Sequence, residues 1–180
     1  MKDRKNIVIF VGSIRRENYS LKTAKILAGE FNKHDNYECD ILILKEYKLP
    51  LPGQTLPGSK VKEFRKKVAD ADGIVMITPE YNGSVSSVLK VMIENLSYPS
   101  EVKGKPVSLV GIASGDIGAI KSLEHLRSIC AHIGGIVLPK QASIPNVEDY
   151  FDENDNCTDP KIEKRLRAVA AYLMNFLETR

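Results

Sequence analysis

The stretch TPEYNGSVSSVLKVMIENL, residues 78–96, decides the fold. It follows GIVMI (73–77), a continuous apolar run that is typical of a parallel strand covered on both faces. Asn-Gly usually marks a β-hairpin, because both residues tolerate positive φ. Behind Asn82-Gly83, however, apolar residues recur every three or four positions, which predicts an amphipathic helix: Val85, Val88, Leu89, Met92, Ile93 and Leu96. The pair therefore indicates a strand-to-helix loop.

The same alternation of strand and helix continues along the rest of the chain. We expect strands at 6–11, 39–44, 73–77, 106–113 and 134–139, and helices at 21–31, 61–69, 85–96, 117–133 and 161–177. Strict alternation predicts an α/β fold with parallel strands and helices on both faces. Five strands suit a flavodoxin-like three-layer sandwich with sheet order 2-1-3-4-5, which places a ligand crevice between strands 1 and 3.

Length and composition are those of one globular domain, which we expect to span residues 1–180. A net charge of +3 is too small to indicate nucleic-acid binding. The N-terminal apolar run is too short for a signal peptide or a membrane span, which favours a cytoplasmic protein. Cys39, Cys130 and Cys157 are far apart, and the histidines have no metal-ligand spacing, so we expect neither a disulfide nor a metal site.

Three loops at the carboxyl edge of the predicted sheet are candidate sites. The first, GSIRRENYSLK (12–22), leads into a helix N-terminus, where exposed amides, hydroxyls and an arginine suit a phosphate. It has one glycine and therefore matches neither a P-loop nor a dinucleotide fingerprint. The loop GIASGDIGAIKSL (111–123) has three glycines, which let a flat ligand approach the backbone. Taken singly, each loop is equally explained as a connector.

Two features near the C-terminus are read as structural. The acidic segment NVEDYFDENDNC (146–157) lacks the ligand spacing of a calcium loop, and we expect a solvated loop. Thr158, followed by Asp159 and Pro160, predicts the N-cap of the last helix.

The blocks GSIR with NYSLK, TPEYNGSVSSVLKVMIENLS, and ASGDIGAIKSLEHLRSICAHIGGIVLP resemble the motifs of the NAD(P)H-dependent FMN reductase family, which includes quinone, azo and chromate reductases. They occur in the family's order, and the resemblance covers essentially the whole chain. It implies an FMN site with three groups of residues. These are Ser13, Arg15, Asn18, Tyr19 and Ser20 around the phosphate; Pro79, Glu80, Tyr81, Asn82 and Gly83 along the isoalloxazine; and Ser114 and Gly115 on its other side. The chain departs from many relatives at Asn18, where they have serine, and in VMIENLS, which lacks their tryptophan.

The resemblance further implies that NADPH or NADH reduces the bound FMN. A small-molecule electron acceptor then takes two electrons in the same pocket, with ping-pong kinetics; the candidates are a quinone, an azo compound, free flavin or a metal oxyanion. Because the flavin supplies the chemistry, no catalytic side chain is expected. Backbone amides of residues 80–84, at a helix N-terminus, are expected to stabilise negative charge on the ring. Glu80 equally suits the dipole of the helix that follows it, and Tyr81 equally suits a packing role.

Two other classes compete with a reductase. A flavodoxin-like electron carrier without a nicotinamide site usually has a Thr/Ser-rich phosphate loop and an acidic face, whereas this chain has Arg15-Arg16 and a net charge of +3. A phosphoacceptor signalling domain needs an aspartate where strand 3 ends, and Thr78 and Pro79 stand there instead.

Apolar residues of the 85–96 helix extend beyond one stripe. Val91 and Tyr98 lie off the sheet-facing set and seven positions apart, which predicts that they share another face of this helix. One explanation is scattered exposed apolar surface, which is common. The other is a two-fold contact in a homodimer or homotetramer, as in reductases of the resembling family.

Overall fold

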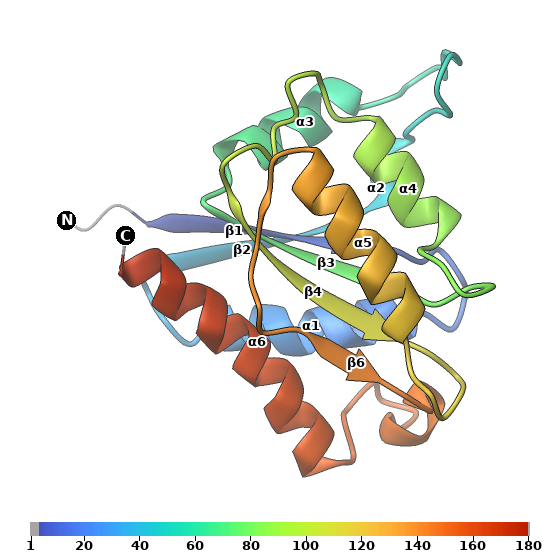
Figure 1. Ribbon diagram of the computed structural model, residues 1–180, viewed down its shortest axis with the longest axis vertical. Coiled ribbons are helices and arrows are strands. Elements are labelled where there is room, and N and C mark those ends of the chain that lie inside the picture. Colours follow the sequence, from blue (N-terminus) through green and yellow to red (C-terminus); the bar gives the residue numbers. More distant parts are fainter. Residues whose placement is uncertain (1–3, 180) are drawn as a thin grey trace.

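In the computed structural model, which describes residues 4–179, a parallel β-sheet lies between two layers of helices (Figure 1). Its strands are β1 (Lys5–Val11), β2 (Tyr37–Ile43), β3 (Gly73–Pro79), β4 (Pro106–Ile112), β5 (Ile136–Val137) and β6 (Ala142–Ile144). The order is β2-β1-β3-β4-β5, with β6 also paired to β4, and all pairings are parallel. The predicted flavodoxin-like order 2-1-3-4-5 is confirmed. The single domain predicted over residues 1–180 includes residues 1–3 and 180, which lie outside the described residues, and stays a prediction.

The helices cover both faces of the sheet. On one face lie α1 (Tyr19–Phe31) and α6 (Pro160–Glu178), and on the other lie α3 (Val61–Asp70), α4 (Ser87–Glu94) and α5 (Ile120–His132) (Figure 1). A four-residue helix, α2 (Leu44–Tyr47), follows β2, and a 3-10 turn, η1 (Val147–Tyr150), follows β6. The sequence pattern indicated neither of these two, because a single turn is too short to show a helical period.

Alternating side chains of the central strands fill two separate cores. In β1, Ile7, Ile9 and Val11 pack toward α1 and α6, whereas Val8 and Phe10 pack toward α3, α4 and α5. The strands β3 and β4 divide their side chains in the same way. This is why the strands are continuous apolar runs, since both faces of a doubly covered sheet exclude water.

The edge strand is divided into two short pieces. The strand β5 pairs with the start of β4 at Pro106 and Val107, and β6 pairs with its end, from Val110 to Ile112. Only two residues of the predicted strand 134–139 are therefore in β5. Pro139 has no N–H to continue the ladder, so the chain leaves the edge after β5 and rejoins it at Ala142, after four intervening residues.

Helix α4 is shorter than predicted, and this corrects one expectation. It begins at Ser87 and ends at Glu94, so Tyr98 lies beyond the helix in a bend before Pro99. The prediction that Val91 and Tyr98 share a helix face is therefore wrong. Val91 packs partly against the α3, α4 and α5 core, and Tyr98 is fully exposed.

The start of α6 corrects another expectation. The N-cap is Asp159, whose Oδ1 accepts from the amides of Lys161 at 2.7 Å and Ile162 at 3.2 Å, and not Thr158. Pro160 fits the first helical position because its missing N–H would be unpaired there, and this makes the preceding aspartate the cap.

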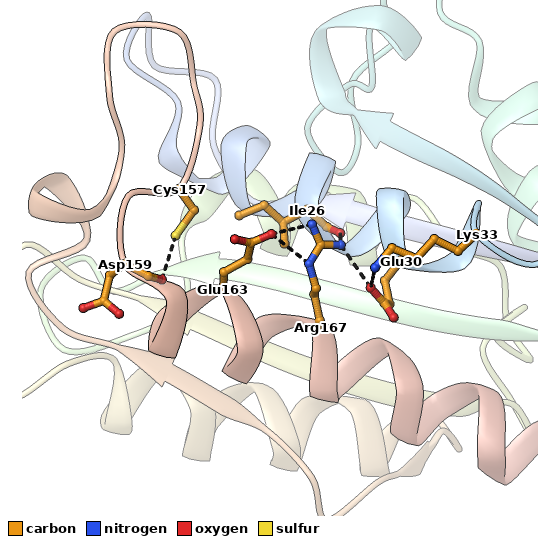
Figure 2. Close-up of polar contacts among 7 residues, drawn as sticks. All are labelled: Ile26, Glu30, Lys33, Cys157, Asp159, Glu163 and Arg167. Carbon is orange, nitrogen blue, oxygen red and sulfur yellow. Dashed lines mark hydrogen bonds and ion pairs between the residues drawn. The ribbon is translucent and has the colours of Figure 1, made fainter.

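Helices α1 and α6 also meet through a polar cluster centred on Arg167 (Figure 2). Its guanidinium lies between Glu163 on α6 and Glu30 on α1, 3.0 Å from the Glu30 carboxylate, and it also donates to the carbonyl of Ile26. Lys33 donates to the same Glu30 carboxylate at 2.6 Å. The cluster fastens two helices that are far apart in the sequence.

The acidic segment 146–157 was predicted to be a solvated loop, but it packs against α1. Asp155 pairs with Lys22 at 3.1 Å and with Lys25 at 2.9 Å, both on α1. The rings of Tyr19 and Phe151 pack with their centroids 6.0 Å apart. The segment is therefore bound against the first turns of α1, because its carboxylates meet lysines that local sequence does not place beside it.

Candidate functional site

The loops after β1, β3 and β4 meet at one edge of the sheet, beside the crevice between β1 and β3 (Figure 1). They enclose two adjoining cavities of about 280 Å³ and about 400 Å³. Of the twelve residues predicted for the site, eight line the first cavity: Ser13, Arg15, Tyr19, Ser20, Pro79, Glu80, Tyr81 and Ser114. The second shares four of these and adds Asn82, Gly83 and Gly115. Asn18 lines neither cavity.

The loop after β1 and the loop after β3 are joined by a buried serine, Ser86, whose role the sequence pattern did not indicate. The Ser86 hydroxyl donates to the carbonyl of Gly12 at 2.6 Å and accepts from the Leu89 amide, which makes it the N-cap of α4. A Cβ on Gly12 would lie 2.5 Å from the carbonyl oxygen of Ile77, so only glycine allows the two strand ends to approach this closely. A serine before an apolar helical run is a recognisable cap signal, but its second partner is not visible in the sequence.

Asn18 shapes the first loop from inside. Its side-chain amide donates to the Ser13 carbonyl at 2.9 Å, and its oxygen accepts from the Leu21 amide at 3.1 Å, which caps α1. Both ends of the side chain are therefore occupied by the backbone.

The first turn of α1 has unpaired donors beside the first cavity. Within residues 4–179, the amides of Tyr19 and Ser20 have no protein acceptor, as expected at a helix N-terminus. The hydroxyl of Ser20 is also buried without a hydrogen-bond partner. A buried hydroxyl without a partner is costly, so this one is a candidate ligand group.

The pair Asn82-Gly83 forms a small hairpin inside the strand-to-helix loop. Both residues have positive φ, 51° and 71°, and Tyr81 and Ser84 exchange two backbone hydrogen bonds of 3.1 Å. The loop prediction holds, but the turn also keeps the geometry that Asn-Gly adopts in hairpins.

This hairpin corrects the expectation for the amides of residues 80–84. Those of Glu80, Tyr81 and Ser84 donate to backbone carbonyls, and α4 begins only at Ser87. Of the five amides, those of Asn82 and Gly83 have no acceptor in the described part of the chain.

Glu80 interacts with a different helix from the one that follows it. Its carboxylate accepts from the amide of Ser122 at 2.9 Å, in the first turn of α5. An anion there satisfies an orphan donor and favours the positive end of the helix dipole. Glu80 thus holds the loop after β3 against the loop after β4.

Arg15 and Tyr81 connect the two cavities. The Arg15 guanidinium carbon lies 4.5 Å from the centroid of the Tyr81 ring, in a cation–π contact, and both residues line both cavities. Arg15 has no ion-pair partner among residues 4–179, so its charge is available to a ligand.

The loop after β4 is fixed by residues that follow β6, a contact that the sequence pattern did not indicate. The Ser114 hydroxyl donates to Glu148 at 2.7 Å, and Val147 and Glu148 line the first cavity. A Cβ on Gly115 would meet nothing within 4 Å, so the backbone is open toward the second cavity.

Metal ligands and reactive thiols were also sought among the described residues at this edge of the sheet. No cluster of three or more histidine, cysteine or acidic residues in residues 4–179 is placed to hold a metal. Burial raises the pKa of Cys39 and of Cys130 to about 12, which keeps both thiols protonated at neutral pH, and no cysteine lines either cavity. Among the helices of the described region, none is long and apolar enough to cross a membrane.

Comparisons with known proteins agree with this arrangement. The family model described as NADPH-dependent FMN reductase matches residues 5–149. A 2-hydroxy-1,4-benzoquinone reductase of Burkholderia sp is 32% identical over 182 residues, covering 96% of this chain and 92% of that protein. An FMN-dependent NADPH-azoreductase of Staphylococcus haemolyticus (strain JCSC1435) is 33% identical over 181 residues, covering 94% of each.

Among solved structures, the flavoenzyme NAD(P)H:(acceptor) oxidoreductase (FerB) from Paracoccus denitrificans superposes with a TM-score of 0.77 at 23% identity. The match covers 97% of this chain and 98% of that one, and it supports the fold. The expected activity class, NAD(P)H-dependent FMN reduction, and the expected cofactors FMN and NAD(P)H are those of the matching family and its relatives. The chain belongs to the NADPH-dependent FMN reductase family.

Proposed function

We propose that the chain works as a single FMN-binding domain that oxidises NADPH or NADH and transfers two electrons to a small planar acceptor, a quinone first of all. One observation carries the assignment of the site. Three loops converge on the crevice between β1 and β3, where the Ser20 hydroxyl is buried without a partner. That crevice is where flavodoxin-like sheets bind FMN.

The first cavity fits the phosphate of FMN. The unpaired amides of Tyr19 and Ser20 and the Ser20 hydroxyl supply donors, and Arg15 supplies a positive charge without an acidic partner. Ser13 lines the same cavity. We assign these four residues to the phosphate and Asn18 to the shape of the loop that holds them.

The second cavity fits the flat ring. When bound, FMN supplies hydride transfer at N5. We assign the unpaired amides of Asn82 and Gly83 to the stabilisation of negative charge on the ring, and Glu80 and Tyr81 to its position. Pro79, which lines the adjoining first cavity, is assigned to the same face of the ring. We assign Ser114 and Gly115, which line the same cavity, to the other side of the ring, where the backbone at Gly115 is open.

The acceptor class rests on two kinds of support. The names of the similar proteins are those of a hydroxybenzoquinone reductase and an azoreductase. The second cavity is bounded by Ile117, which is 79% exposed and gives an apolar wall for a planar molecule. Azo compounds, free flavin and metal oxyanions are the other acceptors to compare.

Two measurements test this function. The purified protein, alone or after mixing with FMN, is expected to show flavin absorption with about one FMN per chain, because one crevice is present at the switch point. Steady-state oxidation of NADPH with a benzoquinone is expected to give ping-pong kinetics. Tight FMN binding without nicotinamide oxidation would instead indicate an electron carrier.

Ser20→Ala tests the phosphate assignment. We expect about tenfold weaker FMN binding and unchanged riboflavin binding, since a hydrogen bond to a charged group contributes about 1.5–3 kcal/mol. Isothermal titration of the apoprotein measures both. Ser108→Ala is the matched control, because that hydroxyl is also buried and unpaired but lines neither cavity. Equal losses for both ligands would move the phosphate elsewhere.

We also propose that the protein is cytoplasmic and forms a homodimer or homotetramer. Three unpaired cysteines suit a reducing compartment, and fully exposed Tyr98 and largely exposed Leu51 suit contacts between subunits. The mass in solution at micromolar concentration tests the assembly, and cell fractionation tests the location.

A further inference from the structure

Helices α4 and α5 lie on the same face of the sheet (Figure 1). A groove between them has lining residues that differ from those of both cavities of the proposed flavin site. It has a volume of about 530 Å³. Its lining combines apolar Val85 and Ile129 with hydroxyl groups and two basic side chains: Ser84, Ser87, Ser128, Lys90 and His125. An apolar floor with hydroxyl and cationic donors is the chemistry that binds a nucleoside carrying a phosphate.

The groove lies next to the second cavity, here called the ring-side cavity, because consecutive residues line the two. Gly83 lines that cavity and Ser84 lines the groove, so the Asn82-Gly83 turn separates them. Lys121 crosses this turn, since a Cβ on Gly83 would lie 3.4 Å from its Cδ and 4.0 Å from its Nζ. No ion-pair partner for Lys121 is present in the described chain. A ligand reaching from the ring into the groove therefore passes an unpaired ammonium group.

His125 is held in the groove by Ser84. The Ser84 Oγ lies 2.9 Å from the Nδ1 atom of His125. When the hydroxyl donates to Nδ1, the ring proton is on Nε2, which is then a donor for a ligand. The same contact fixes the end of the small hairpin against α5.

Lys90 is the second basic group of the lining. It forms an ion pair with Glu94 one turn later on α4, and its side chain remains 44% exposed. Exposed pairs of this kind contribute little to stability, so Lys90 can also contact a phosphate at small cost.

We propose that this groove binds the adenosine 2′-phosphate end of NADPH, with Lys90 and His125 on the 2′-phosphate and Lys121 on the pyrophosphate. This inference rests on the proposed function, because it takes the nicotinamide to lie over the ring-side cavity. It makes the α4–α5 groove the element that distinguishes NADPH from NADH. Glu94 pairs with Lys90 and offsets part of the positive charge of the groove, so the expected preference is about tenfold rather than thousandfold.

Lys90→Ala tests the 2′-phosphate contact. The ratio of kcat/KM for NADPH to kcat/KM for NADH, measured with one quinone, is expected to fall about tenfold, because only NADPH has the phosphate. Lys66→Ala is the matched control. Lys66 is also exposed and also pairs with an acid four residues later, Asp70, but it lies on α3. An unchanged ratio in Lys90→Ala would overturn the assignment.

Lys121→Ala tests the proposed path between the ring-side cavity and the α4–α5 groove. Both nucleotides have the pyrophosphate, so kcat/KM is expected to fall several-fold for each while their ratio stays the same. A fall for neither nucleotide would place the pyrophosphate away from the Gly83 turn.

Direct binding separates this inference from the proposed function. Titration calorimetry of the FMN-loaded protein is expected to show tighter binding of adenosine 2′,5′-bisphosphate than of AMP, and Lys90→Ala is expected to remove the difference. If NADPH is oxidised but the two probes bind equally, the groove assignment fails and the function stands. If neither nicotinamide nucleotide is oxidised but the bisphosphate binds through Lys90, the function fails and the groove stands.

Discussion

Ser86 shows how one hydroxyl organises the site. It is fully buried, caps α4 and donates to the Gly12 carbonyl 74 residues earlier in the chain. The ends of β1 and β3 are thereby held together where the ligand crevice opens. Loss of this hydrogen bond is costly in free energy, because the Gly12 carbonyl would remain buried without a donor and would carry its full desolvation cost.

Ser86→Ala is therefore expected to lower the free energy of unfolding by about 2 kcal/mol, through the lost cap and the unpaired Gly12 carbonyl. Urea denaturation measures the change. Ser87→Ala is the control, since its exposed side chain lies next in the chain, and we expect a change within about 0.5 kcal/mol. Equal effects of the two substitutions would contradict this role.

Arg15 is placed where it could contact either the phosphate or the ring of FMN. Its guanidinium stacks on Tyr81 while lining both cavities, so it is able to reach a phosphate or the ring. We expect Arg15→Ala to weaken FMN binding about tenfold more than riboflavin binding, because a charge-assisted bond to phosphate is lost. The same titrations that test Ser20 measure this difference. Similar weakening of both flavins would assign Arg15 to the ring.

At the scale of elements, α1 and α6 depend on the Arg167 cluster (Figure 2). Burial raises the pKa of Glu30, but hydrogen bonds from Lys33 and Arg167 outweigh it and hold that pKa below its ordinary value of 4.5. A pKa that is lower in the folded than in the unfolded state stabilises the fold above pH 4.5. The contribution is lost as the pH falls through the lower folded value.

Glu30→Gln is expected to lower the free energy of unfolding by about 1–2 kcal/mol at pH 7, because Arg167 and Lys33 lose a charged acceptor. The difference from wild type is expected to shrink as the pH falls below 4.5. Urea midpoints over a pH series measure it. Glu38→Gln, which removes an exposed pair with Arg4, is the control with little change. A difference that is constant with pH would show that the Glu30 charge has no role.

At the scale of the whole molecule, the site is built from loops on both sides of the sheet. The loop after β1 leads into α1 on one face of the sheet, and the loop after β3 leads into α4 on the other face. A ligand in the crevice therefore contacts elements from both cores. FMN at a hundred times its Kd is expected to raise the free energy of unfolding by about 2.7 kcal/mol. Thermal denaturation with FMN and with riboflavin at equal concentration measures this, and equal shifts would contradict a phosphate site.

Local patterns were sufficient for much of the architecture. Apolar runs and turn residues predicted the strand order and the three site loops, because strands buried on both faces must be apolar and parallel crossovers need helices. Eleven of the twelve predicted site residues line the two cavities. The limits of α4 and the division of the edge strand were missed, since a cap and a proline act over only one or two residues.

The sequence by itself determined the α/β fold, the strand order and the edge of the sheet at which the candidate site lies, because each depends on periodicity and turn residues within a few positions. Only the tertiary structure decided the partners of the polar groups: Ser86 with Gly12, Glu80 with Ser122, Ser114 with Glu148, and Ser84 with His125. These pairs are separated by 34 to 74 residues. A hydrogen bond needs its two atoms within about 3 Å, and that proximity exists only after the helices pack on the sheet.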